Sequence, residues 1–235
     1  KSGANVKVLG DFIVKSTSKC TFVMGLSGTL VVNGDLTATT ALKINQNEGS
    51  YLKICGNFTR GKEVGSFNAG VLEVQGNYNG KIVGSGTHLV ILSGSTLQNI
   101  DNLKAQNLHI ENTSTEGVNF TGTSYIYGEI KNENTPLNNG KSIHLYGGTI
   151  GGTRYIGDIR IERYVSIKND IEIIGDMYFY ENDAAHITIS ENTDLTIQGN
   201  VNADVYTTIL DESGMTIKSG ANVKVLGDFI VKSTS

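Results

Sequence analysis

Residues 30–35 read LVVNGD, and the pattern of this hexapeptide recurs along the whole chain. We call it the strand-corner phrase: apolar, any, apolar, any, Gly, then often Asp or Asn. Apolar residues at every second position indicate a β-strand with one buried face and one wet face. Gly supplies backbone freedom, and Asp or Asn tolerates left-handed conformations and hydrogen-bonds its own backbone. The phrase therefore predicts a short strand that ends in a corner. Further copies stand at 6–11 (VKVLGD), 52–57 (LKICGN), 72–77 (LEVQGN), 171–176 (IEIIGD), 195–200 (LTIQGN) and 223–228 (VKVLGD), and looser ones end at Gly94, Asn112, Gly128 and Gly147.

The spacing of these phrases predicts the fold class. From Gly10 to Gly227 they divide the chain into about eleven intervals of roughly 20 residues, a size typical of repeats that stack as solenoids. Each interval has room for one or two further short strands. We therefore expect an all-β, single-stranded β-solenoid (β-helix) of about eleven to twelve coils, continuous over residues 1–235. The alternative, an immunoglobulin-like sandwich, lacks a shared phrase with one corner chemistry.

The two ends of the chain are identical in sequence. Residues 1–18, KSGANVKVLGDFIVKSTS, return letter for letter as residues 218–235. Internal coils share only a pattern, so the identity indicates a tandem array with a unit of 218 − 1 = 217 residues. The alternative is an artificial duplication of one coil. No helix, Pro or dense charge covers either strand edge, so we expect the ends to join identical units head to tail, covalently or not. The predicted inter-unit joint consists of Val6, Val8, Phe12, Val223, Val225 and Phe229.

Composition excludes several classes of protein. The 235 residues include 29 Gly, one Pro and no Trp, and only 18% are charged, which excludes an all-helical fold. A net charge of −4 offers no attraction to nucleic acid. No run of about 18 apolar residues is present, so no membrane insertion is expected. Cys20 and Cys55 are too few for a disulfide scaffold, lack the CxxC spacing of a metal or redox site, and leave the redox compartment open.

Acidic corner residues are the first candidates for chemistry. Asp11 and Asp35 should lie on neighbouring coils about 5 Å apart, and paired carboxylates can bind calcium or act as acid and base. Asn57 and Asn77 occupy the same slot in the next two coils, however. This substitution favours a structural corner, and no metal or other cofactor is expected.

The four histidines do not form a metal motif. His109 and His144 share an outward slot three residues before a corner, but on two coils about 10 Å apart, too far for one zinc ion. We expect all four, which include His88 and His186, to be surface side chains.

Three tyrosines are the candidate binding residues. Tyr127 and Tyr146 each precede a corner on neighbouring coils, with Tyr125 two residues upstream. An outward aromatic stack of this kind can bind sugars or proteins. The alternative is a cross-strand ladder that only stabilises the sheet.

Enzymatic motifs are missing from the sequence. Neither GxSxG, HExxH nor GxxxxGK[ST] occurs. A polysaccharide lyase or hydrolase of β-helix fold would need a cleft built from long loops, and the clearest insertions are 112–123 and 131–141. We expect no enzyme.

The amino-acid sequences of three segments resemble those of a known family. GTLVVNGDLT (28–37), LKICGNFTRGKEVGSFNAGVLEVQGNYNG (52–80) and GTHLVILSGSTLQNIDNLKAQNLHIENTSTEGVNF (86–120) resemble repeat regions in cell-surface and secreted proteins of Clostridium-like Gram-positive bacteria. The likeness is good over residues 25–130 and elsewhere rests on the strand-corner phrase. The resemblance implies a β-solenoid stalk, adhesin or fibre, an extracellular or cell-surface location, and no catalytic residue.

Together these observations predict a structural unit of a long extracellular filament or surface stalk. The alternative is an adhesin that binds polysaccharide or a host surface through Tyr125, Tyr127 and Tyr146.

Overall fold

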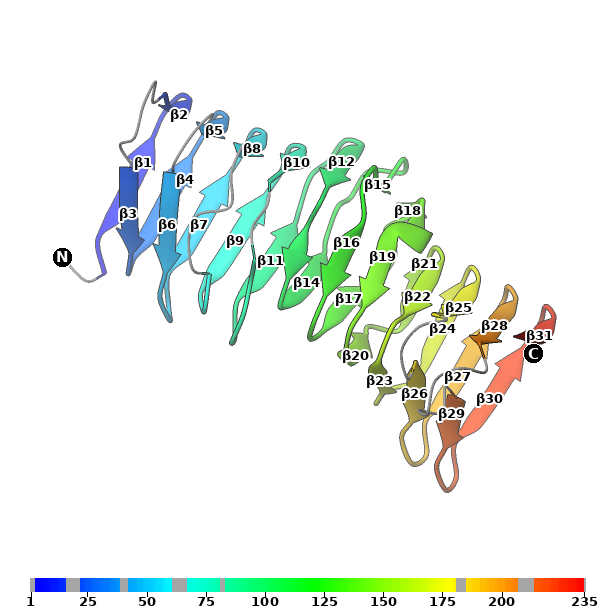
Figure 1. Cartoon of the computed structure of the whole chain (residues 1–235). Coiled ribbons are helices and arrows are strands. Elements are labelled where there is room, and N and C mark those ends of the chain that lie inside the picture. Colours follow the sequence, from blue (N-terminus) through cyan, green and yellow to red (C-terminus); the bar gives the residue numbers. More distant parts are fainter. Residues whose placement is uncertain are drawn as a thin grey trace.

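The structure is a computed structural model that describes residues 3–15, 22–38, 42–60, 67–80, 83–180, 185–206 and 214–234. Within these ranges the chain forms 31 β-strands and one short 3₁₀ turn, η1 (Gly140–Ser142). Every pairing between the described strands is parallel and joins one coil to the next. The molecule is an all-β solenoid with its two ends far apart (Figure 1). The predicted all-β solenoid of stacked parallel strands is confirmed.

Three faces wind round the solenoid in the chain order 1, 2, 3. Face 1 is a single eleven-stranded sheet. Its strands are β1 (Asn5–Val8), β4 (Thr29–Val32), β7 (Tyr51–Ile54), β9 (Val71–Val74), β11 (Leu89–Leu92), β14 (Asn107–Ile110), β17 (Ile130–Asn132), β20 (Gly148–Gly151), β23 (Tyr164–Ile167), β26 (His186–Ile189) and β29 (Gly214–Ile217).

Face 2 combines a seven-stranded and a four-stranded sheet, which a bridge between Pro136 and Ile156 connects. Its strands are β2 (Phe12–Val14), β5 (Leu36–Ala38), β8 (Phe58–Arg60), β10 (Tyr78–Asn79), β12 (Gln98–Asp101), β15 (Val118–Phe120), β18 (Leu137–Asn138), β21 (Arg154–Ile156), β24 (Ile171–Ile174), β27 (Asp194–Ile197) and β30 (Asn222–Val225).

Face 3 begins with a strand pair and continues as a seven-stranded sheet, and bridges through Phe67 and Val83 link the two parts. Its strands are β3 (Phe22–Leu26), β6 (Leu42–Gln46), β13 (Lys104–Ala105), β16 (Ser124–Ile126), β19 (Ile143–Leu145), β22 (Ile159–Ile161), β25 (Met177–Phe179), β28 (Val201–Tyr206) and β31 (Phe229–Thr234).

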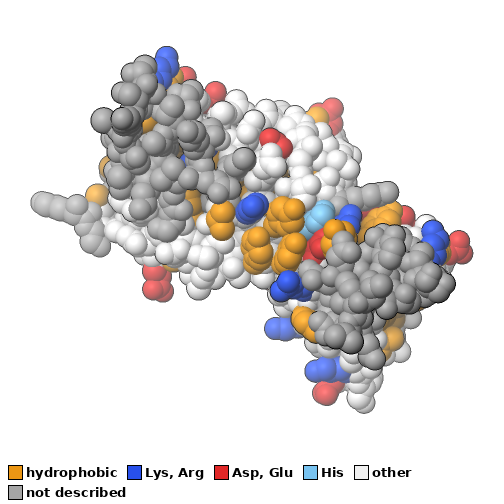
Figure 2. Space-filling view, in the orientation of Figure 1, with side chains coloured by type: hydrophobic (Ala, Val, Ile, Leu, Met, Phe, Trp, Pro, Cys, Tyr) orange, Lys and Arg blue, Asp and Glu red, His pale blue; other side chains and the backbone are white. Residues whose placement is uncertain are grey.

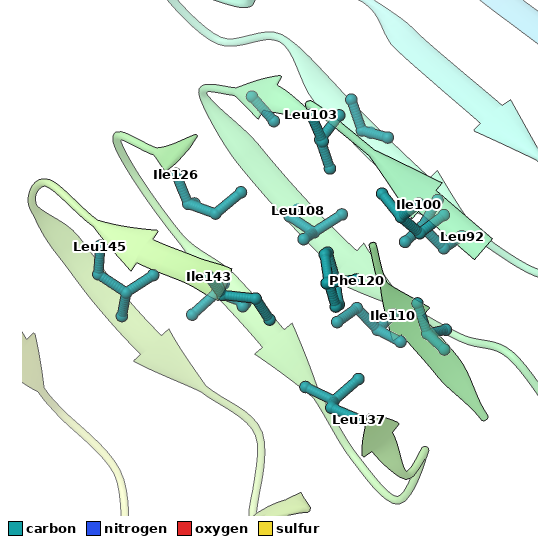
Figure 3. Close-up of a cluster of buried hydrophobic side chains, with 14 of the residues drawn as sticks. Leu92, Ile100, Leu103, Leu108, Ile110, Phe120, Ile126, Leu137, Ile143 and Leu145 are labelled. Atoms are coloured by element: carbon teal, nitrogen blue, oxygen red, sulfur yellow. The ribbon is translucent and has the colours of Figure 1, made fainter. Parts of the chain in front are cut away.

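The core is a stack of aliphatic columns between the three faces. Leu30, Leu52 and Leu72 pair in register on face 1, and the residues between them point outward, as the two-residue period predicts. Side chains from all three faces meet along the axis (Figure 3). Buried core positions predicted by the strand-corner phrase are Leu30, Val32, Leu52, Ile54, Leu72 and Val74, each at most 5% exposed.

The strand-corner phrase does not stay on one face of the solenoid. The first four copies lie on face 1, in β1, β4, β7 and β9, whereas the last three lie on face 2, in β24, β27 and β30. The looser versions that end at Gly128 and Gly147 follow strands of face 3. His109 and His144 therefore lie on different faces, and their predicted common slot is wrong.

The two expected insertions are also absent as loops. Residues 112–123 contain β15, and residues 131–141 contain β18 and reach η1, so both stretches build face 2. The short 3₁₀ turn is the one helical element that the described ranges contain, and no helix in them has the length and apolarity to cross a membrane.

Candidate functional site

A ladder of side-chain hydrogen bonds runs along the corners of the solenoid. In each rung, the side-chain oxygen of an Asp or Asn accepts the backbone N–H of the equivalent residue one coil later. Asp11 Oδ1 accepts from Asp35 (2.9 Å), and Asp35 Oδ1 accepts from Asn57 (2.7 Å). The candidate carboxylate pair is thus used as a structural acceptor. Further rungs join Asn57 to Asn77 and Asn77 to Asn99 between faces 1 and 2, and Asp158 to Asp176, Asp176 to Asn200 and Asn200 to Asp228 between faces 2 and 3, all at 2.7–2.9 Å.

Glycine precedes most residues of the ladder, and between coils there is no space for a side chain. A Cβ atom on Gly56 would lie 2.2 Å from Asp35 Oδ1 and 2.7 Å from the carbonyl carbon of Gly34. Gly56 has no left-handed backbone, and the non-glycine residues with positive φ in the described ranges are Asn102, Asn139 and Asn192, outside the ladder. The expected bonds to the residue's own backbone are not the main role of the Asp or Asn, because its side-chain oxygen accepts from the next coil. At Gly56 the reason for glycine is the close approach between coils, whereas Gly157 and Gly175 also have a positive φ and use the backbone freedom that the sequence predicts.

The three candidate tyrosines lie together on the outer side of face 3. Tyr125 belongs to β16, and Tyr127 and Tyr146 directly follow β16 and β19. The Tyr146 ring centroid lies 5.5 Å from those of Tyr125 and Tyr127, with tilts of 58° and 40°. Burial, with a smaller contribution from Tyr125, raises the pKa of Tyr127, so its hydroxyl stays a neutral donor. The aromatic cluster forms across neighbouring coils, as the sequence predicts.

Cationic and imidazole groups that sequence reasoning missed surround these rings. Lys104 Nζ lies 5.5 Å from the Tyr125 ring centroid, and Arg163 Cζ lies 5.7 Å from that of Tyr146. Figure 2 shows orange side chains, a class that includes both hydrophobic residues and tyrosine, next to basic and His side chains in the middle of the molecule. The sequence signal for these neighbours is the recurrence of Tyr, His and Arg in YIY (125–127), HLY (144–146) and RIERY (160–164). The three segments can be aligned only once their strands are assigned to face 3. We use the name aromatic–cation surface for a set of eight residues: Lys104, Tyr125, Tyr127, His144, Tyr146, Arg160, Arg163 and Tyr180.

A buried carboxylate anchors this surface. Glu162 is 1% exposed, and its Oε1 contacts His144 Nδ1 and, at 3.3 Å, Arg160 Nε. Arg160 in turn lies over the Tyr180 ring, with 4.1 Å from Cζ to the ring centroid. These contacts hold side chains of the aromatic–cation surface in place within the structure.

His88 contradicts the expectation of four surface histidines. Its side chain is fully buried beside Phe67, and its Nε2 lies 3.2 Å from Gln46 Oε1. Burial lowers the pKa of His88 to about 4, so the ring is neutral at pH 7. The structure brings together no group of three His, Cys, Asp or Glu side chains fit for a metal ion, as far as its described ranges extend. Cys55 is a free thiol, and Cys20 lies outside the described residues.

The predicted joint residues all point into the core of a terminal coil. Val6 pairs with Leu30 and Phe229 pairs with Val201, both of which are buried. Val6 itself is 53% exposed and Phe229 is 55% exposed, because a coil covers each of them on one side only. Val8, Phe12, Val223 and Val225 are partly buried in the same manner.

Comparison of the chain with protein-family models, with curated proteins and with solved structures found no match.

Proposed function

We propose that this chain is the structural repeat unit of a long extracellular filament or surface stalk, of about eleven coils, which stacks end to end with identical units through its terminal coils. The observation that carries the proposal is the pair of identical terminal segments, whose core side chains are packed on one side and open on the other. The eleven strands of face 1 support the number of coils.

Stiffness follows from three kinds of contact that run along the axis. Backbone hydrogen bonds join the coils on every face, the aliphatic columns fill the interior, and the corner ladder ties successive coils at their edges. At about 4.8 Å per coil, one unit is about 50 Å long. A rod of this kind holds its ends at a set distance, which is what a stalk or filament needs.

A two-unit chain, residues 1–217 followed by residues 1–235, tests the proposal. In electron micrographs we expect a single straight rod about 100 Å long. The matched control carries a flexible Gly-Ser insert between the units and should bend at its middle. Two independently oriented bodies in the chain without the insert would refute the proposal.

Adhesion to a polysaccharide is the second candidate, and the aromatic–cation surface favours it. Tyrosine rings offer faces for sugar rings, and Lys104, Arg160 and Arg163 offer charge to acidic sugars. A glycan array with Tyr127→Ala tests it, with Tyr164→Ala on face 1 as the matched control because Tyr164 is also an exposed tyrosine. Binding that Tyr127→Ala leaves unchanged, or no binding by the unchanged protein, would reject this candidate.

A further inference from the structure

The two identical segments occupy different faces of the solenoid. In the first copy, VKV lies in β1 on face 1 and FIV lies in β2 on face 2. In the second copy, VKV lies in β30 on face 2 and FIV lies in β31 on face 3. The same eighteen residues have therefore moved one face onward. From β1, the chain passes ten further strands of face 1, and β30 then follows on the next face.

The two copies use opposite edges of the same strands. In the first copy, Asp11 Oδ1 accepts the N–H of Asp35 from the coil that follows. In the second copy, the N–H of the equivalent Asp228 donates to Asn200 Oδ1 in the coil that precedes, at 2.8 Å. Backbone bonds agree, since Asn33 donates to Val8 of the first copy. Superposition of the copies thus gives one segment with both edges paired.

The core columns continue through the same superposition. Val223 pairs with Leu195 on one side, and its equivalent Val6 pairs with Leu30 on the other. In the superposition the shared segment therefore has an apolar partner on the preceding coil and another on the following coil. Its own conformation need not change, because it is a β-strand in both copies.

We infer that a second copy of this chain continues the solenoid through the shared segment and is rotated by one face, about a third of a turn, relative to the first. This inference rests on the proposed function and adds its symmetry. The unit is not a whole number of coils, so equivalent faces return only after three units, or 3 × 217 = 651 residues. The aromatic–cation surface, on face 3 of one unit, lies on face 1 of the next and on face 2 of the third.

Two labels on the 235-residue chain test the face shift itself. Cysteines replace Lys7 and its sequence equivalent Lys224, both exposed, in a Cys20→Ser, Cys55→Ser background, and carry biotin for streptavidin. The matched control pairs Lys7→Cys with Thr216→Cys, which lies on face 1 like Lys7. In the control, the angle between the Lys7 and Thr216 labels measures the twist of the solenoid along face 1. Relative to Lys7, electron microscopy should therefore show the Lys224 label about a third of a turn from the direction of the Thr216 label. Coincident directions would overturn the inference.

The two-unit chain then tests the array, with Tyr164→Cys in each unit and the same label. We expect the two labels about 50 Å apart along one rod and on different sides of it, offset by about a third of a turn after correction for twist. A single rod with both labels on one side would overturn the rotation and leave the filament proposal standing. Two separate bodies would overturn the proposed function, and the inference with it.

A glycine pair provides an independent readout that needs no label. In the 235-residue chain a Cβ on Gly10 meets nothing within 4 Å, whereas one on the equivalent Gly227 lies 2.6 Å from Asn200 Oδ1. In the two-unit chain, alanine at the glycine of the shared segment should lower the unfolding temperature, and Gly10→Ala in the first unit should not. Equal effects would show that the shared segment does not pair with the preceding coil, and would overturn the inference.

Discussion

Replacement of the corner glycine Gly56 by alanine isolates the contact between coils from the backbone freedom of glycine. The new methyl group would lie 2.2 Å from Asp35 Oδ1, so the carboxylate must move and release the N–H of Asn57. Overpacking costs about 1–3 kcal/mol, and the lost hydrogen bond costs about 1 kcal/mol. We expect a total near 3 kcal/mol, which lowers the unfolding temperature by roughly 10 °C in a chain of this length.

The matched control is Gly10→Ala, which changes the same position of the strand-corner phrase in the first coil. No atom lies within 4 Å of the new Cβ, and Gly10 has no left-handed backbone. Lower entropy of the unfolded chain should make this variant about 0.5 kcal/mol more stable. Thermal unfolding followed by circular dichroism, with hydrogen exchange at the Asn57 amide, measures both variants. Changes of the same sign and size would refute the steric explanation.

Three further changes probe the interior. Val32→Asp places an unpaired charge at a fully buried position and should cost about 4 kcal/mol or more, seen as a lower urea midpoint, whereas Val32→Ala should cost less. Gln98→Leu should cost about 3 kcal/mol, because the buried Gln98 accepts from the Gly94 N–H and from Asn112 Nδ2 and donates to two carbonyls; faster exchange of the Gly94 amide would localise the loss, and an unchanged midpoint would contradict it. The pKa of His88 is about 4 in the folded protein and about 6.5 in the unfolded chain, so its contribution to the free energy of unfolding is complete above pH 6.5 and about 3 kcal/mol is lost by pH 4. His88→Gln should flatten the pH dependence of the unfolding temperature between pH 4 and 6.5. An unaltered profile would exclude His88 as the source of that dependence.

Much of the architecture could be predicted from residues 30–35 and their copies. The two-residue period of LVVNGD defines which side chains enter the core, and Leu30 and Val32 are buried as that period requires. The tyrosines could be placed together because Tyr127 and Tyr146 stand at the same distance before a corner. Local patterns of this kind survive folding because each coil contacts only its neighbours.

The three-faced path of the chain could not be predicted in the same way. The strand-corner phrase describes one strand and one corner, and any of three corners can supply the space that its Gly needs and the N–H that its Asp or Asn accepts. Coil lengths vary, so the phrase moves from face 1 at Gly76 to face 2 at Gly175 without any change in its wording. The partners of Tyr125, such as Lys104 on the preceding coil and His144 on the next, were hidden for the same reason. The burial of His88 likewise involves Gln46 from another coil.

The direction of the corner ladder makes the molecule a polar object. In every rung given above the donor belongs to the later coil and the acceptor to the earlier coil. The ladder therefore gives the rod a direction, and the two ends of the rod are chemically unlike. A filament built head to tail from this unit would have two distinguishable ends. Units that add head to tail through the shared segment would keep this direction from one end of the filament to the other.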